Sequence, residues 1–266
     1  MIRRLPAVLA LAAGVAMLVT ACGGTTTTAG PALTDPDAII TAALKSTEAA
    51  KSVHVEIDID GKAKIVLPGT GTGTGPGTSV DVTGTTVSAD IDFEAPAARA
   101  TFAIPALLNF SGEVIAVDGK SYVRTTLTGP LYQESAASGS VDDPSDAGRV
   151  IDGLGDLLQK EGVELVKGDD AACGSEQCYT VTADLTAEDL GIGGASATLG
   201  LPIDLQGASL KLTVHVEKDL PYHLAGVTAV LTMADGNTIA AELTTSKWDE
   251  PVSISAPPPD KVKPAS

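Results

Sequence analysis

The three cysteines carry the most distinctive side-chain chemistry in this sequence, and they fall into two groups. Cys173 and Cys178 are separated only by residues 174–177, Gly-Ser-Glu-Gln, whose types favour a turn. Cys22 stands alone near the start of the chain. A close pair around a turn in an exported chain indicates a disulfide, whereas the odd cysteine in such a chain needs another explanation.

The alternatives for the Cys173 and Cys178 pair are a redox motif and a metal site. A redox motif would have two residues between the cysteines instead of four. Metal binding would need a third and a fourth ligand, and none stands nearby in the sequence. A disulfide that closes so short a loop contributes about 2 kcal/mol of stability at most.

The segment before Cys22 has the layout of a secretory signal peptide. Arg3 and Arg4 give a positive start, an apolar run covers 5–19, and small residues precede the cysteine. The run is too short and too rich in alanine and glycine for a transmembrane helix, which needs about 20 strongly apolar residues. The junction Val-Thr-Ala-Cys at 19–22 resembles a bacterial lipobox, in which the cysteine is acylated and begins the mature chain.

We therefore expect residues 1–21 to be removed and Cys22 to carry acyl chains. Two or three chains give stable membrane anchoring, since each buried methylene contributes about 0.8 kcal/mol. The predicted location is the extracytoplasmic face of the cell membrane, or the cell surface, with the protein anchored to the membrane and not spanning it. The alternative is a signal peptide that is cut elsewhere and leaves an incidental cysteine.

No other group of side chains forms a catalytic motif. Serine-hydrolase chemistry needs a nucleophile beside a positioned base, but the chain has three histidines and no Gly-x-Ser-x-Gly elbow. His54 and His215 each precede a glutamate by two residues, which could be half of a metal site, although alternating strands often produce such pairs. Lys120 lies in a Gly-Lys-Ser triplet that predicts a turn and lacks the rest of a P-loop. We expect no enzyme, no metal and no cofactor.

The charge and composition limit the partners further. The net charge is −17, and the loss of Arg3 and Arg4 with the signal peptide makes it −19. So negative a chain is a poor ligand for nucleic acid and would not lie flat on an anionic membrane. Aromatic residues make up only 3% of the chain. Any large cavity would thus have an aliphatic lining, which suits acyl chains, although an ordinary core has the same composition.

Hydrophobic periodicity predicts a single α+β domain. A flexible tether covers 22–34, a helix capped by Asp35 ends near residue 51, and a second amphipathic helix covers 150–158. Gly/Thr/Pro-rich and polar loops cover 68–79 and 134–148. The predicted strands are 53–60, 80–87, 89–93, 98–104, 114–117, 122–126, a hairpin over 163–181, 210–217, 222–233 and 238–248. Many strands with few helices indicate a sheet that curls.

Two predicted elements have a pronounced apolar face. In the first strand apolar residues alternate with polar and mostly acidic ones, so one face is buried and the other is wet. In the second helix the apolar residues recur at helical spacing. These faces would flank a cavity in a ligand carrier or fill the core of a closed module, and the candidate cavity-lining residues are Val53, Val55, Ile57, Ile59, Val150, Leu154 and Leu158.

Several segments, in their shared order, resemble the LppX/LprA/LprF/LprG family of actinobacterial lipoproteins. They are the helix running into Ser52-Val53-His54, the hairpin at 114–122 with Asp118-Gly119, the helix with Gly153-Leu154 and Leu157-Leu158 after Asp143-Pro144, the closing strand with Ser246-Lys247-Trp248, and Pro257-Pro258 in the tail. The chain departs from the family pattern at the loop 68–79, after Gln133, and in the cysteine pair.

The resemblance implies a fold similar to LolA and LolB, a U-shaped, half-open antiparallel β-barrel or sheet with helices packed across it over an apolar cavity. It also implies a monomeric, non-enzymatic carrier of multi-acylated lipids or glycolipids across the cell envelope, with a membrane lipid exporter as a candidate partner. The lipid-binding domain would cover 35–256, and a Pro-rich tail, 257–266, would need no fold of its own. The alternative is a lipid-anchored surface interaction module without a ligand cavity.

Overall fold

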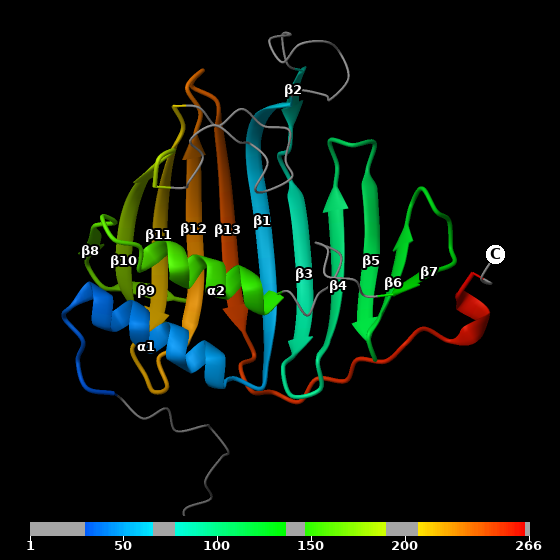
Figure 1. The fold of residues 1–266 in the computed structure, drawn as a ribbon, viewed down its shortest axis with the longest axis horizontal. Coiled ribbons are helices and arrows are strands. Elements are labelled where there is room, and N and C mark those ends of the chain that lie inside the picture. Colours follow the sequence, from blue (N-terminus) through cyan, green and yellow to red (C-terminus); the bar gives the residue numbers. More distant parts are fainter. Residues whose placement is uncertain (1–29, 66–77, 137–146, 190–206, 264–266) are drawn as a thin grey trace, which may run out of the picture.

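The computed structural model describes residues 30–65, 78–136, 147–189 and 207–263, which form one large antiparallel sheet and two α-helices (Figure 1). The helices are α1 (Pro36–Ala49) and α2 (Ala147–Leu158), and a short 3-10 helix, η2 (Pro259–Lys261), lies near the end. The strands are β1 (Ser52–Ile65), β2 (Thr78–Asp81), β3 (Thr85–Asp92), β4 (Ala97–Ile104), β5 (Phe110–Val117), β6 (Lys120–Thr125), β7 (Gln133–Ala136), β8 (Leu165–Lys167), β9 (Ala171–Cys173), β10 (Glu176–Thr186), β11 (Ser209–Glu217), β12 (Leu224–Thr232) and β13 (Thr238–Ser246).

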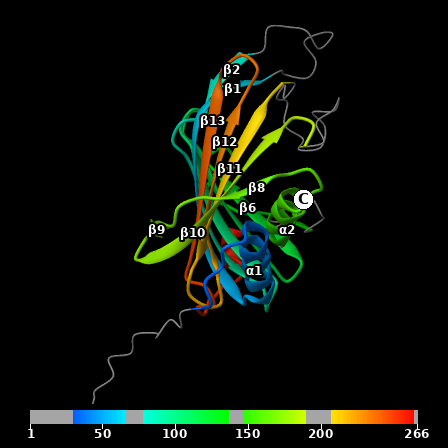
Figure 2. The same ribbon diagram turned by 90° about the vertical axis from the view of Figure 1, so that its left-hand side faces the viewer.

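The sheet has 13 strands among the described residues, in the order β7-β6-β5-β4-β3-β1-β13-β12-β11-β10-β8, with β2 beside β1 and β9 beside β10. The long strand β1 lies in the middle, and the meanders β3–β7 and β10–β13 extend from it on either side. Both helices lie across one face, over the β10–β13 half (Figures 1 and 2). The predicted α+β class with a large antiparallel sheet is confirmed, but the edge strands β7 and β8 do not pair, so the sheet is open.

Most predicted elements are present, but one strand boundary was wrong, and the start of the loop predicted over 134–148 instead forms the edge strand β7, which pairs with β6. The alternation of residues 80–87 predicted one strand, but the chain turns after β2 and starts β3 at Thr85. The turn forms because the Asp81 carboxylate accepts a hydrogen bond from the Thr83 backbone N–H at 3.0 Å. Gly84 then adopts a φ of +76°, which a glycine tolerates. The predicted loops fall largely on 66–77 and 137–146, outside the described residues.

Local sequence signals explain the first helix and the cysteine pair. The Asp35 carboxylate accepts a hydrogen bond from the Ala38 backbone N–H at 3.0 Å, and Pro36 occupies the first helical position. Cys173 and Cys178 are joined by the predicted disulfide across the β9–β10 turn, with their Cα atoms 5.9 Å apart. Among the described residues, no helix combines the length and the apolar character that crossing a membrane requires.

The C-terminal segment packs against the sheet, although the sequence suggested no fold for it. After β13 it runs along one end of the sheet to the far edge (Figure 1). There Tyr132, just before β7, donates its backbone N–H to the carbonyl of Lys261 at 2.8 Å and accepts from Lys263 at 2.8 Å. The side chains of Ile254 and Val262 pack against a small cluster formed by Ile115, Tyr122 and Tyr132.

A buried carboxylate stabilises this edge of the sheet. Glu113 on β5 accepts hydrogen bonds from Arg99 Nε, Arg124 Nη2 and the Tyr132 hydroxyl at 2.7, 2.7 and 2.6 Å. Burial raises the pKa of Glu113, but the hydrogen bond from Tyr132 and the two guanidinium groups outweigh it, so the pKa lies below its usual value. The charged form of Glu113 therefore links three strands and the tail.

We predict that Glu113→Gln lowers the free energy of unfolding by about 2 kcal/mol at pH 7, because charged hydrogen bonds to a buried group are lost. A depressed folded-state pKa gives stability that is present above the unfolded-state pKa and disappears as the pH falls. The difference from wild type should therefore shrink below about pH 4.5. Urea unfolding of both proteins at pH 7 and below about pH 4.5 measures this difference in the free energy of unfolding. The control Glu94→Gln, in an exposed pair with Lys51, should change stability by less than about 0.5 kcal/mol.

Candidate functional site

The helix-side face of the sheet is apolar across its central strands because the alternation in β1 is matched by its neighbours. Ile57 pairs with Val87 of β3 on one side and with Leu243 of β13 on the other. Further from β1, Val87 pairs with Phe102 of β4, and Leu243 with Val227 of β12. Facing residues in an antiparallel sheet point to the same side, so each strand continues one apolar surface.

The two helices cover only one half of this face. Ile39, Ile40 and Ala43 of α1 and Leu158 of α2 are buried in one cluster with apolar residues of β10, β11 and β12, and Leu154 packs against its margin. The helices lie directly on these strands, and the described residues leave a cavity of only about 10 Å³ beneath them. The large enclosed apolar cavity implied by the resemblance is therefore not seen in this part of the molecule, because the helix side chains fill the space.

The other half of the apolar face has no described helix over it. Here β1, β3, β4, β5 and β6 present half-buried apolar side chains on the helix side of the sheet. Phe102 lies so close to Gly112 of β5 that a Cβ added there would come within 2.6 Å of its ring. The residues of this open apolar face are Val55, Ile57, Ile59, Val87, Ala89, Ala100, Phe102, Val114 and Val123.

The structure divides the predicted cavity residues between these two regions. Val53 is buried in a small cluster with Ile91 and Ala98, and Val55, Ile57 and Ile59 belong to the open face. Leu154 and Leu158 lie in the helix-covered core. Val150 lies in α2, in the part whose side chains are not described. The contributions of β3–β6 were not singled out from the sequence, although their own alternation is a visible signal.

One contact between distant segments fixes α1 to the end of the sheet. Ser46 near the end of α1 hydrogen-bonds His223 Nδ1 at 2.9 Å, and both residues are buried. The other side of the contact is Trp248, whose ring stacks on His223 with centroids 4.7 Å apart. Trp248 also donates its indole N–H to the carbonyl of Leu224 at 3.2 Å. Burial lowers the pKa of His223, and Asp249 opposes this only partly, so the neutral ring is favoured.

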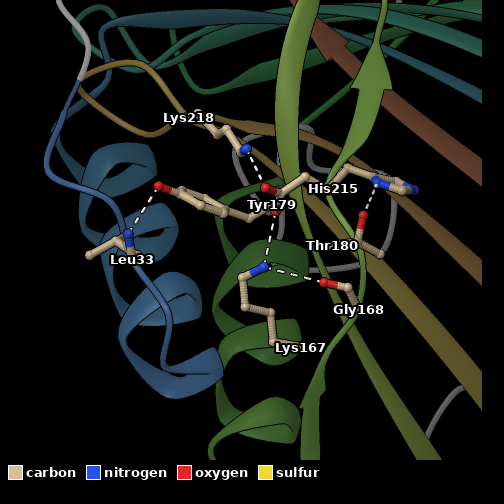
Figure 3. Close-up of polar contacts among 8 residues, drawn as sticks. Leu33, Lys167, Gly168, Tyr179, Thr180, His215 and Lys218 are labelled. Atoms are coloured by element: carbon tan, nitrogen blue, oxygen red, sulfur yellow. Dashed lines mark hydrogen bonds and ion pairs between the residues drawn. The ribbon is translucent and has the colours of Figure 1, made fainter.

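The tether joins the domain at a defined place. The backbone N–H of Leu33 donates to the Tyr179 hydroxyl at 3.0 Å, and the Tyr222 hydroxyl donates to the carbonyl of Pro31 at 2.9 Å. Figure 3 shows Tyr179 between the ammonium groups of Lys167 and Lys218, which lie 5.6 and 5.3 Å from its ring centroid. Cys22, the predicted lipid anchor, lies outside the described residues.

A wide groove lies on the opposite, polar face of the described residues. It has a volume of about 760 Å³ and is overhung by the β9–β10 hairpin, which projects from the sheet away from the helices (Figure 2). Its lining includes Glu176, Glu217, Glu242 and His215. Acyl chains do not bind to such carboxylate-rich surfaces, so size alone does not make this groove the lipid site. The described residues contain no group of three or more metal-binding side chains.

Glu217 is the most perturbed acid of this groove. Desolvation, and after it the neighbouring carboxylates of Glu176 and Asp219, together raise its pKa to about 7. His54, also on the polar face, contacts two carboxylates: its Nδ1 lies 2.6 Å from Asp90 of β3, and its Nε2 lies 3.6 Å from Glu56, the neighbour that the sequence suggested.

The comparisons with known proteins decide the family. The model of the LppX_LprAFG lipoproteins matches residues 35–254, which includes both helices and every strand of the sheet. The chain belongs to this lipoprotein family. No curated protein sequence matches the chain significantly.

One solved structure agrees with the fold of this lipoprotein. LprF from Mycobacterium bovis is similar with a TM-score of 0.55 and 18% identity, over 86% of this chain and 99% of that one. LppX from Mycobacterium tuberculosis has a TM-score of 0.48 and 22% identity, over 84% and 100%. A LolA superfamily protein from Nitrosomonas europaea has a TM-score of 0.28 and 10% identity, over 86% of this chain and 97% of that one. The LprF likeness supports the fold alone.

The raised pKa of Glu217 predicts a pH-dependent stability. A raised folded-state pKa gives stability that is complete below the unfolded-state value of 4.5 and is lost as the pH rises through about 7. Glu217→Gln should therefore melt at the same temperature as wild type at pH 4 and at a higher temperature at pH 8. Glu176→Gln removes one repelling charge and should shift the melting temperature at pH 8 in the same direction. Equal melting temperatures of Glu217→Gln and wild type at pH 8 would contradict this.

Proposed function

We propose that this lipoprotein binds the acyl chains of multi-acylated lipids or glycolipids against its open apolar face and carries them across the cell envelope. The observation that carries the proposal is the apolar half-sheet formed by β1, β3, β4, β5 and β6, whose aliphatic side chains are only half buried. Soluble domains rarely leave so extended an apolar surface without a partner. Its family membership supports the same conclusion.

The physical argument is the cost of moving acyl chains through water. Each apolar Å² removed from water contributes about 25 cal/mol, so a long acyl chain needs a continuous apolar surface to leave a membrane. The open face offers flat aliphatic side chains and no charged group, since the acids of β1 point to the other side of the sheet. Bound chains would lie across the strands, while polar head groups protrude at the margin.

The anchor and the location belong to the same proposal. Acylated Cys22 would hold the protein at the extracytoplasmic face of the membrane, residues 22–34 would serve as the tether, and 35–256 would be the lipid-binding domain. The tether begins to contact the domain at Pro31 and Leu33, so its free part is short. A membrane lipid exporter is the partner class that would supply such a carrier, which we propose to act as a monomer.

A second candidate function is favoured by the polar face. The groove of about 760 Å³ beneath the β9–β10 hairpin is lined by several carboxylates, which would suit docking of a cationic partner. In that case the protein would be a lipid-anchored interaction module without a lipid ligand. The two functions use opposite faces of one sheet, so variants of neighbouring residues in a strand separate them.

The open apolar face leads to a prediction about the ligand. Protein purified from its own organism should carry a stoichiometric lipid with at least two acyl chains, seen by native mass spectrometry and lipid extraction. Ile57→Asn places an amide on the open apolar face and should weaken binding of a fluorescent diacyl probe about tenfold, since an unpaired amide is costly there. The matched control Glu56→Asn introduces the same residue on the opposite face and should leave the affinity unchanged.

Protein that carries no lipid and takes up no acyl probe would contradict lipid carriage and favour the interaction module. Equal loss of probe binding in Ile57→Asn and Glu56→Asn would show that the open face is not the site. Thermal unfolding of both variants distinguishes lost binding from lost folding.

The proposed anchor leads to a prediction about Cys22. Cys22→Ala removes the thiol that is acylated in a lipobox and should leave a soluble protein or an unprocessed precursor. Fractionation of cells into membrane and soluble parts, with intact-mass measurement of the product, tests this. A Cys22→Ala chain that fractionates with membranes and has the same processed mass shift as wild type would show that the anchor lies elsewhere.

A further inference from the structure

Two neighbouring loops at one end of the open apolar face expose large aliphatic side chains. The β4–β5 turn carries Leu107 and Leu108, which are 49% and 98% exposed, and the β6–β7 loop carries Leu127 and Leu131, which are 84% and 36% exposed. Because β5 and β6 are antiparallel, the start of β5 and the end of β6 lie at the same end of the sheet. Two hydrogen bonds between Ser111 and Thr126, of 2.9 and 3.3 Å, join the bases of the loops. We call these four leucines the leucine tip.

Folding does not explain the residue at 108. Leu108 has a φ of +56°, in the left-handed region that leucine rarely adopts and that costs backbone energy without a glycine or asparagine. Its side chain is almost fully exposed, so packing does not repay this cost. A strained and exposed large apolar side chain at a turn indicates a contact outside the chain.

The leucine tip is also free of charge in a strongly acidic protein. No charged residue occurs in 100–112 or in 125–133, whereas the whole chain contains 51 charged residues, 34 of them acidic. Of the flanking charges, Arg99 and Arg124 both pair with the buried Glu113, so no unpaired carboxylate lies next to the tip. The tip is thus a place where this acidic molecule can meet a lipid surface without placing carboxylates in it.

The tip is continuous with the open apolar face. Phe102 near the end of β4 and Phe110 at the start of β5 lie on the helix side of the sheet, with ring centroids 5.4 Å apart. They connect Val87 and Ala100 of the open face with the turn that bears Leu107 and Leu108. An acyl chain could therefore pass from the tip to the face without crossing a polar surface.

We propose that the leucine tip is a membrane-docking element, which inserts into the interfacial region of a lipid bilayer and sets the end of the open apolar face against it. A bilayer fits better than a protein partner, because the tip is a projecting, charge-free surface, and none of the pockets described lies at it. In Figure 1 the two loops lie at the corner of the sheet opposite the point where the tether joins it. Docking through the tip is therefore a second membrane contact, separate from the proposed anchor at Cys22. The role of the tip in transfer rests on the proposed function, but its contact with lipid does not.

The test uses the full mature chain with an environment-sensitive fluorophore attached through Leu108→Cys. The disulfide occupies Cys173 and Cys178, and predicted acylation occupies Cys22, so the new thiol is the one that reacts. Asp118→Cys is the matched control, because Asp118 is also exposed at a turn with a φ of +53° and lies at the other end of the β5–β6 hairpin. Neutral and anionic phosphatidylcholine-based vesicles, with and without brominated acyl chains, are the probe surface.

We expect the label at 108 to shift its emission to shorter wavelength on vesicles and to be quenched by brominated lipid, while the label at 118 does neither. Adding Leu107→Asp and Leu127→Asp to the chain labelled at 108 should abolish the quenching without lowering the melting temperature. The same double variant without a label should still bind the diacyl probe, whereas Ile57→Asn should keep the quenching at 108. Failure of the proposed function is thereby distinguished from failure of the tip.

Three outcomes would overturn the proposal. A label at 108 that stays in water on every vesicle composition excludes insertion. Equal quenching at 108 and 118 shows that the whole domain lies on the surface. A label at 108 that is shielded in the absence of vesicles, and more so at higher protein concentration, identifies a second copy of the chain as the occupant of the tip.

Discussion

The structure depends on the period-two alternation of β1, which separates an apolar from an acidic surface in the middle of the sheet. Val55, Ile57 and Ile59 define the apolar side, and their pairing with β3 and β13 carries this side to both meanders. A slip of one residue would reverse every side chain of the strand. It would place Glu56 and Asp58 on the apolar face and leave the isoleucines in water. The helices, the open face and the acidic groove all derive their positions from this one register.

Local patterns predicted the elements because their causes are local. The Asp35 cap, the alternation of 53–60, the Asp118-Gly119 turn and the cysteine pair each fix the backbone within a few residues. The break after Asp81 was missed because polar and apolar residues keep alternating through the turn, which is held by the hydrogen bond from the Thr83 backbone N–H to the Asp81 carboxylate. The fine position of α1 was not predictable, since it depends on the contact of Ser46 with His223, 177 residues away. The apolar composition of the open half could be anticipated, but the sequence did not show that both described helices would lie over the other half.

Polar contacts hold the margins of the sheet where apolar packing is thin. Glu113 joins β4, β5 and β6 through two arginines and connects them to the tail through Tyr132. At the other end of the molecule, Trp248 contacts both the core under α1 and the small cluster around Val53. Trp248 therefore joins the packing of the helix-covered half to that of the strands beside β1.

The C-terminal segment gives the free edge of the sheet a partial cover. An edge strand with unpaired backbone groups is a template for the addition of strands from other molecules. Beside β7, the backbone N–H and carbonyl of Tyr132 are already taken by Lys261 and Lys263, and Val262 forms a bridge with Tyr132. The end of the chain thus occupies backbone groups beside β7 that an added strand would otherwise use. Recombinant versions of the protein should keep residues up to Lys263 and place affinity tags beyond them.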